Sequence, residues 1–163
     1  MPLASRDAPL PSDALAVRSM AAGTGFFRQD EVDVAVELVE ERLAKGHESG
    51  YCFYFIDLDG VPAGYVCYGS TPCTIGSFDL YWIVVARENQ GKGLGLELMR
   101  MAENAARNMG GRNMYVETSG KELYRPTRAF YEKAGYVQAA LLPDFYDVGD
   151  DKIIYQKALR PMR

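Results

Sequence analysis

The residues with the clearest chemical signature form the glycine-rich segment Gln90-Gly91-Lys92-Gly93-Leu94-Gly95. Glycine adopts positive φ and lets a ligand approach the backbone closely, and the unpaired N–H groups at a helix start favour a phosphate anion. The segment matches neither the Walker pattern G-x-x-x-x-G-K-[ST] nor the dinucleotide pattern G-x-G-x-x-G. It therefore predicts a phosphate or pyrophosphate site of another kind, the alternative being a tight strand-to-helix turn without a ligand.

Two carboxylates and a tyrosine are the candidates for acid–base chemistry. Glu117 stands between Val116 and Thr118 in a half-apolar run, where a carboxylate is unusual unless it is exposed or functional. Asp79 lies in a neighbouring strand-like run, and Tyr131 lies near the end of a short helical segment. The alternatives are a solvent-facing strand end for Glu117 and simple packing for Tyr131.

These segments are expected to be positioned by a mixed α/β fold. The run 78–86 is apolar on both faces, which is typical of a strand at the centre of a sheet covered on both sides, and 93–109 carries an apolar helical stripe. Periodicity and turn signals predict further strands over 14–20, 51–56, 61–68, 113–118, 136–141 and 152–158, and helices over 30–45 and 126–134. The predicted order is β-α-β-β-β-α-β-α-β-β, with strands and helices interleaved.

Length and composition indicate one globular domain. The 163 residues, 48% hydrophobic and 25% charged, fit a single domain over 14–163 behind a flexible leader at 1–13. The net charge of −4 argues against a nucleic-acid scaffold. Three cysteines, with no signal peptide and no run of membrane-spanning length, predict a reduced cytoplasmic protein without a membrane partner. A single histidine and no Cys-x-x-Cys pattern predict no metal site.

Two motifs in register resemble those of the GNAT superfamily of N-acetyltransferases. Gln90 to Gly95 is similar to the signature Q/R-x-x-G-x-G/A, which holds the coenzyme A pyrophosphate between the fourth strand and the next helix. Arg128 to Tyr136 is similar to the family's segment that ends in aromatic-Tyr-Glu-Lys-x-Gly-aromatic. The resemblance extends from Ala14 to Leu159. It implies a central mixed, mostly antiparallel sheet of about six to seven strands with helices on both faces, and acetyl-coenzyme A (acetyl-CoA) as cosubstrate.

The resemblance also implies roles for individual residues. The pantetheine arm is expected along Ile83 to Val85, with the backbone N–H around Val84 stabilising the oxyanion. Tyr131 matches the tyrosine that the family commonly aims at the coenzyme sulfur, as an acid for the departing thiolate. Tyr124 stands where many relatives carry Asn, at the adenosine end of the cofactor. Arg128 is a candidate for a cofactor phosphate or, alternatively, an ordinary exposed arginine.

The implied reaction needs a base, because a primary amine with a pKa of about 10.4 is almost entirely protonated at neutral pH. Glu117 matches the glutamate position of ribosomal-protein N-terminal acetyltransferases, a branch of the superfamily. Asp79 is the rival, and the two could act together through a water. We expect direct transfer rather than an acetyl-cysteine intermediate, because no histidine lies near Cys73 in sequence.

The acceptor is expected to be the primary amine of a small molecule. The alternatives are a protein N-terminus or lysine, and a non-catalytic acyl-CoA sensor with the same fold. The segment 143–151 is acidic and aromatic; with the Phe26-Phe27 turn it could form a rim for a cationic acceptor, or it could simply be a solvated loop. Superfamily members often form homodimers, so a second copy of the chain is a candidate partner.

Overall fold

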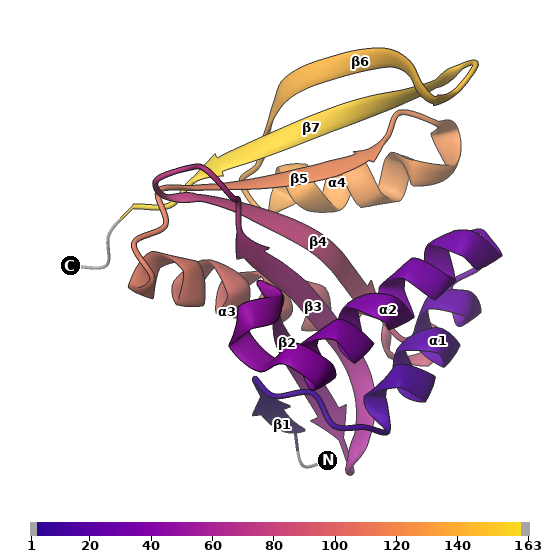
Figure 1. Cartoon of the computed structure of the whole chain (residues 1–163). Coiled ribbons are helices and arrows are strands. Elements are labelled where there is room, and N and C mark those ends of the chain that lie inside the picture. Colours follow the sequence, from indigo (N-terminus) through magenta and orange to yellow (C-terminus); the bar gives the residue numbers. More distant parts are fainter. Residues whose placement is uncertain (1–2, 161–163) are drawn as a thin grey trace. The chain divides into compact units, whose positions relative to one another are not determined.

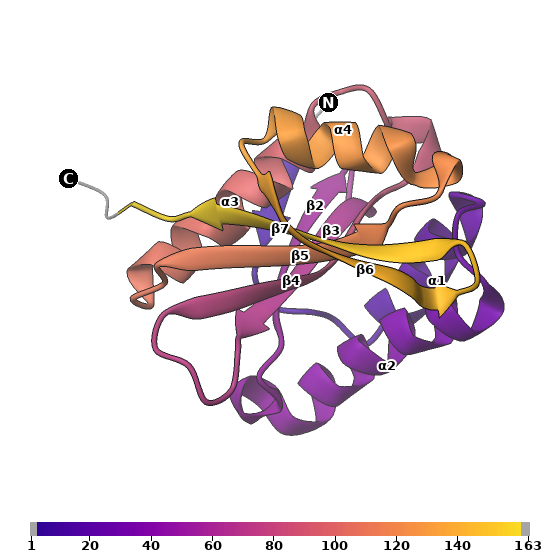
Figure 2. The ribbon, with the colours of Figure 1, turned by 90° about the horizontal axis from the view of Figure 1, so that it is seen from above.

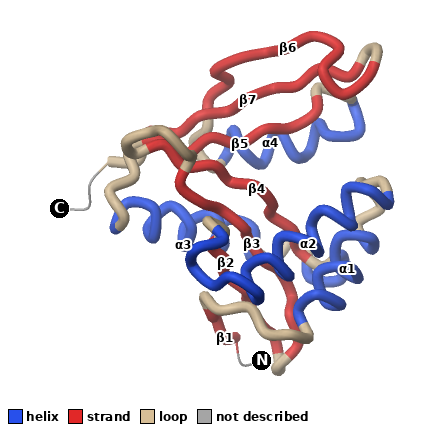
Figure 3. The backbone as a smooth tube through the Cα atoms, in the orientation of Figure 1, coloured by secondary structure: helices blue, strands red, loops and turns tan. Residues whose placement is uncertain are grey.

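The computed structural model describes residues 3–160, in which seven strands pair in the order β1-β2-β3-β4-β5-β7-β6. Every pairing whose register is known is antiparallel except the parallel pair β4·β5. Figure 3 shows the strands and the helices that flank them. The mixed, mostly antiparallel fold predicted from the sequence is thereby confirmed.

The chain divides into two compact units, which are described separately. The first holds the residues up to Gly69 together with Trp82–Asn104; the second holds Ser70–Tyr81 and the residues from Ala105 onward. Strand β4 and helix α3 each contribute to both units, so neither unit is a continuous piece of chain. The single domain over 14–163 therefore remains a prediction.

The first unit is a sheet with helices on both faces (Figure 1). Its core joins α1 and α2 to one face through Val17, Val36, Phe53 and Tyr65, among other buried side chains. On the opposite face, Gly64 brings the sheet close to α3, since a Cβ there would lie 3.0 Å from Val84 O and 3.1 Å from Leu98 Cδ1. The elements of this unit are β1 (Leu3–Arg6), α1 (Asp13–Gly23), α2 (Gln29–Lys45), β2 (Cys52–Leu58), β3 (Val61–Ser70), the end of β4 (Ser77–Val85) and most of α3 (Leu94–Asn108).

The strand expected over 14–20 is wrong, because this segment lies in helix α1. Its buried side chains Val17, Met20 and Ala21 have helical spacing, although the run also reads as a short apolar strand. The helix start is fixed by Asp13, whose carboxylate accepts a hydrogen bond from Leu10 N at 2.6 Å. This contact stabilises the first turn of the helix.

The flexible leader expected at 1–13 also needs correction, because residues 3–6 form β1 and pair antiparallel with β2. Arg6 holds this edge strand in place. Its guanidinium donates to Asp13 at 2.6 Å and Asp57 at 2.7 Å, and lies 4.4 Å from the Phe55 ring centroid. The hydrogen bond to Asp13, opposed by burial, raises the pKa of Arg6, and the buried carboxylate of Asp13 is thereby paired.

The second unit joins the beginning of β4 to three further strands and covers one face with α4. Tyr131 of α4 packs against Tyr136 and Tyr155, with ring centroids 6.1 and 5.9 Å away. Figure 2 shows the long β6–β7 hairpin. The expected loop over 143–151 is largely strand, with a turn only around 148–149. The elements are β5 (Asn113–Ser119), α4 (Arg125–Lys133), β6 (Val137–Asp147) and β7 (Asp150–Ala158).

Candidate active site

The glycine-rich segment forms the link between β4 and α3 in the first unit. A single 3-10 turn, Arg87–Asn89, follows β4, and α3 begins at Leu94. Gly91 and Gly93 have φ of 76° and 81°, the left-handed region that L side chains rarely adopt. A Cβ at either glycine would meet no atom within 4 Å. These glycines are therefore required by the backbone conformation rather than by packing, and the space beside them is open.

The two ends of this segment are anchored. Gln90 Nε2 donates to Val85 O at 3.3 Å, and Lys92 Nζ donates to Asn89 Oδ1 at 3.1 Å. Leu94 is buried at the start of α3. A fixed turn with exposed backbone at a helix start has the geometry of an anion site.

Strand β4 presents two unlike faces before this turn. Val84 is buried in the core of the first unit. Ile83 and Val85 are only half-buried, and Tyr81 is exposed. Helices flank both faces of this sheet, as predicted, but the face of Ile83 is covered only in part (Figure 1). The pantetheine arm, which the resemblance implies along Ile83 to Val85, stays a prediction.

In the second unit, Glu117 lies on β5 with its side chain 52% exposed and its Oε2 atom 2.8 Å from Lys152 Nζ. Glu117 is thus half-exposed, as the alternative of a solvent-facing position allows, and it is paired with a lysine. The sequence pattern did not identify Lys152 of β7 as a site residue, because nothing near a lysine in a strand indicates which residue of another strand it will contact. Only the register of β5 on β7 brings the two together.

Asp79 and Glu117 lie on the same face of the sheet, on the neighbouring strands β4 and β5. Asp79 pairs in register with Tyr115, two residues before Glu117 on the parallel neighbour, which separates the two levels by about 7 Å along the strand. Asp79 accepts a hydrogen bond from Thr71 Oγ1 at 2.7 Å. Both carboxylates therefore stay candidates for the base, and their joint action through a water stays a prediction.

Tyr131 is buried in a cluster of aromatic rings at α4. Burial raises the pKa of its hydroxyl well above the ordinary value near 10, so the group stays protonated at neutral pH. Within residues 3–160 no protein group accepts a hydrogen bond from this hydroxyl. A protonated phenol without a protein acceptor is suited to donate to a ligand.

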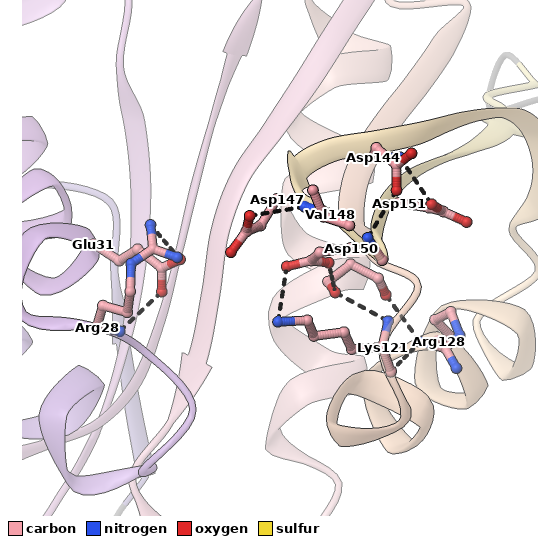
Figure 4. Close-up of polar contacts among 11 residues, drawn as sticks. Arg28, Glu31, Lys121, Arg128, Asp144, Asp147, Val148, Asp150 and Asp151 are labelled. Carbon is pink, nitrogen blue, oxygen red and sulfur yellow. Dashed lines mark hydrogen bonds and ion pairs between the residues drawn. The ribbon is translucent and has the colours of Figure 1, made fainter.

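Arg128 and Tyr124 lie at the start of α4. Arg128 NH1 donates to Ser119 O at 2.9 Å and to Lys121 O at 2.7 Å, which ties α4 to the end of β5 (Figure 4). Tyr124 precedes α4 and is half-buried. Arg128 therefore has a structural role, and its assignment to a cofactor phosphate stays a prediction, as does that of Tyr124.

A buried polar cluster at the end of β5 was not anticipated. Asp150 is almost fully buried, accepts a hydrogen bond from Ser119 Oγ and lies 3.6 Å from Lys121 Nζ. Across the adjoining hairpin, Asp144 Oδ1 accepts from Gly149 N at 2.7 Å (Figure 4). These contacts fix the turn after β5, and several of the acidic residues over 143–151 are thus engaged in holding the hairpin together.

Residues 3–160 contain no cluster of three or more His, Cys, Asp or Glu side chains that could hold a metal ion. No helix in the same range is both long and apolar enough to span a membrane.

The seven-stranded mixed sheet, whose fourth strand leads through a glycine-rich turn into a helix, is the architecture that the GNAT resemblance implied. The chain belongs to the acetyltransferase (GNAT) family, whose model matches residues 19–136. The uncharacterized N-acetyltransferase MJ1530 of Methanocaldococcus jannaschii is 31% identical over 146 residues, covering 80% of this chain and 88% of that protein. The family prediction is therefore confirmed, and the protein is an acyltransferase.

Solved structures agree with this assignment. A crystal structure from Desulfovibrio desulfuricans, assigned to the GNAT family, is 49% identical with a TM-score of 0.95 and covers 98% of this chain and 100% of that chain. An aminoglycoside 6'-N-acetyltransferase complexed with coenzyme A has a TM-score of 0.76 at 18% identity, covering 100% and 99%. The second likeness shows the shared fold.

Proposed function

We propose that this protein transfers the acetyl group of acetyl-CoA directly to the nitrogen of a small primary amine. The observation that carries the proposal is the anchored, open turn at Gln90 to Gly95, with positive φ at Gly91 and Gly93. Its N–H groups are suited to the pyrophosphate of coenzyme A. The coenzyme A bound to the aminoglycoside acetyltransferase of the same fold supports this choice of cosubstrate.

In the proposed reaction the amine nitrogen attacks the thioester carbonyl carbon and the carbon–sulfur bond breaks. Glu117 accepts the proton lost by the nitrogen, directly or through a water. The backbone N–H around Val84 stabilises the oxyanion, and Tyr131 donates a proton to the departing thiolate. Asp79 is the alternative base, since it lies on the same face of the sheet as Glu117.

Direct transfer is supported by the state of the cysteines. Burial raises the pKa of the Cys67 and Cys52 thiols, which disfavours the thiolate that a covalent acetyl-enzyme would need. Acetylation of these two thiols is thereby disfavoured, whereas Cys73 is exposed.

The test is release of free thiol from acetyl-CoA in the presence of a panel of amines, with the products identified by mass spectrometry. We expect thiol release with small primary amines and acetylation on nitrogen. Turnover of peptides alone would assign the protein to the acetyltransferases of protein N-termini or lysines. Calorimetric binding of acetyl-CoA without thiol release from any amine would identify a sensor, and absence of binding would refute the proposal.

A further inference from the structure

The sheet of the second unit has two faces with different surroundings. Strand β7 directs Tyr155 toward α4, where it packs on Tyr131. Lys152 and Ile154 lie on the opposite face by strand alternation, together with Glu117, which is paired in register with Ile154. The candidate base therefore shares a face with a lysine and an aliphatic side chain.

Lys152 is held on this face by a carboxylate and an aromatic ring. Its Nζ atom lies 2.8 Å from Glu117 Oε2 and 4.1 Å from the ring centroid of Phe145 on β6. The lysine side chain is only 14% exposed, whereas that of Glu117 is 52% exposed. A carboxylate and the face of an aromatic ring both attract an ammonium group, so these two contacts fix the position of Nζ.

Both members of the pair keep bonding capacity for a ligand. An ammonium has three N–H donors, and within residues 3–160 the only recorded partners of Lys152 Nζ are Glu117 and the Phe145 ring. Glu117 has a second carboxylate oxygen, and Lys152 is its one recorded ion-pair partner among the described residues. A donor and an acceptor of opposite charge are thus presented side by side.

We infer that the acceptor is a zwitterionic α-amino acid, whose ammonium binds Glu117 while its carboxylate binds Lys152. This inference rests on the proposed function and names its substrate class. An acceptor with only a positive charge would have to compete with Lys152 for Glu117. A molecule with adjacent ammonium and carboxylate groups instead satisfies both residues at once.

The neighbouring surface favours an apolar or aromatic side chain on this amino acid. Phe145 is 52% exposed and Ile154 is half-exposed. Phe145 also stacks edge-to-face with Tyr146, at 5.1 Å between ring centroids. An aromatic acceptor would bury part of this surface and gain ring contacts there.

The experiment compares L-phenylalanine with L-phenylalaninamide, which share the amine and the ring but differ in the carboxylate. We expect wild-type kcat/KM to be about ten- to a hundredfold higher for the acid, because one charge-assisted hydrogen bond is lost with the amide. Lys152→Met should remove most of this preference, and Lys152→Arg should retain it. Circular dichroism checks that each variant is folded.

Lys45→Met is the matched control, since Lys45 also lies 2.8 Å from a glutamate, Glu41, but both side chains are on the exposed face of helix α2. It should leave the preference unchanged. Equal kcat/KM for the acid and the amide in the wild type would overturn the inference, as would a preference that survives Lys152→Met. Calorimetry of both compounds with the CoA-loaded protein makes the same comparison if neither is acetylated. A failure of acetyl-CoA to bind would instead refute the proposed function.

Discussion

Replacing Glu117 by Gln tests the proposed base with little change of shape. The amide keeps the length and hydrogen-bonding reach of the carboxylate but cannot accept the amine proton. Because Glu117 is 52% exposed, we expect a stability cost below about 1 kcal/mol from loss of its ion pair with Lys152. The fold should therefore remain intact, and the effect should appear in the chemistry.

Loss of a general base typically slows a reaction by about 10²–10⁴-fold, or roughly 3–5 kcal/mol of barrier. We expect Glu117→Gln to lower kcat/KM by about 10²-fold or more near neutral pH. Part of the loss should be recovered at high pH, because the free amine then becomes abundant and needs no base. The expected barrier change is thus several times larger than the expected change in stability.

The assay is thiol release measured across pH, with denaturant unfolding of each variant alongside it. Glu41→Gln is the control, since Glu41 pairs with Lys45 at the same 2.8 Å on the exposed face of helix α2. This control variant should lose a similar amount of stability and keep full activity. Full activity and an unchanged pH profile in Glu117→Gln, together with an inactive Asp79→Asn, would move the base to β4. Full activity in both variants would mean that the protein supplies no base and acts only by positioning the substrates and stabilising the oxyanion.

Tyr131→Phe should lower kcat by about 10²-fold with little change in the affinity for coenzyme A. The hydroxyl has no protein partner within residues 3–160, so its loss leaves the ring packing intact. An unchanged kcat, with the chemical step rate-limiting, would show that Tyr131 serves only in packing. Gly95→Val should weaken the affinity for coenzyme A, measured by calorimetry, by at least about tenfold. The helix should persist, because Gly95 lies inside α3 without positive φ and valine has a higher helix propensity than glycine. An undiminished affinity would contradict the proposed phosphate site. Ionisation of tyrosines should not affect the free energy of unfolding below about pH 10. Above about pH 10 it should make the free energy of unfolding fall as the pH rises. Burial raises the pKa of Tyr65 and Tyr131, so the unfolded chain loses these protons first as the pH rises. Denaturant unfolding measured between about pH 9 and 11, roughly 1 unit either side of a normal tyrosine, would show no such fall in stability if the rings were accessible.

Several elements could be predicted because their determinants are local. Helix α2 carries its buried stripe of Val32, Ala35, Val36 and Val39 at helical spacing. The β2–β3 hairpin turns at Asp59-Gly60, where both residues have positive φ, as Asp-Gly favours. The glycine-rich turn before α3 is equally local. Backbone preference and short-range periodicity decide such segments before any tertiary contact is made.

Segments whose determinants lie far along the chain could not be predicted in this way. The apolar run in α1 fits a strand or a helix, and its helical start depends on Asp13 being held by Arg6, itself fixed by Asp57 of β2. Edge strand β1 has no pattern of its own and exists because β2 offers unpaired backbone groups.

The sequence by itself determined the family motifs, the turn at Gln90 to Gly95 and the candidates Glu117 and Tyr131. Only the tertiary structure decided the surroundings of those candidates. The pairing of Glu117 with Lys152 depends on the β5–β7 register, and the carbonyl contacts of Arg128 depend on where α4 meets the end of β5. Hydrogen bonds and ion pairs reach only about 3–4 Å, so they follow from the register of whole strands rather than from residue spacing in the chain.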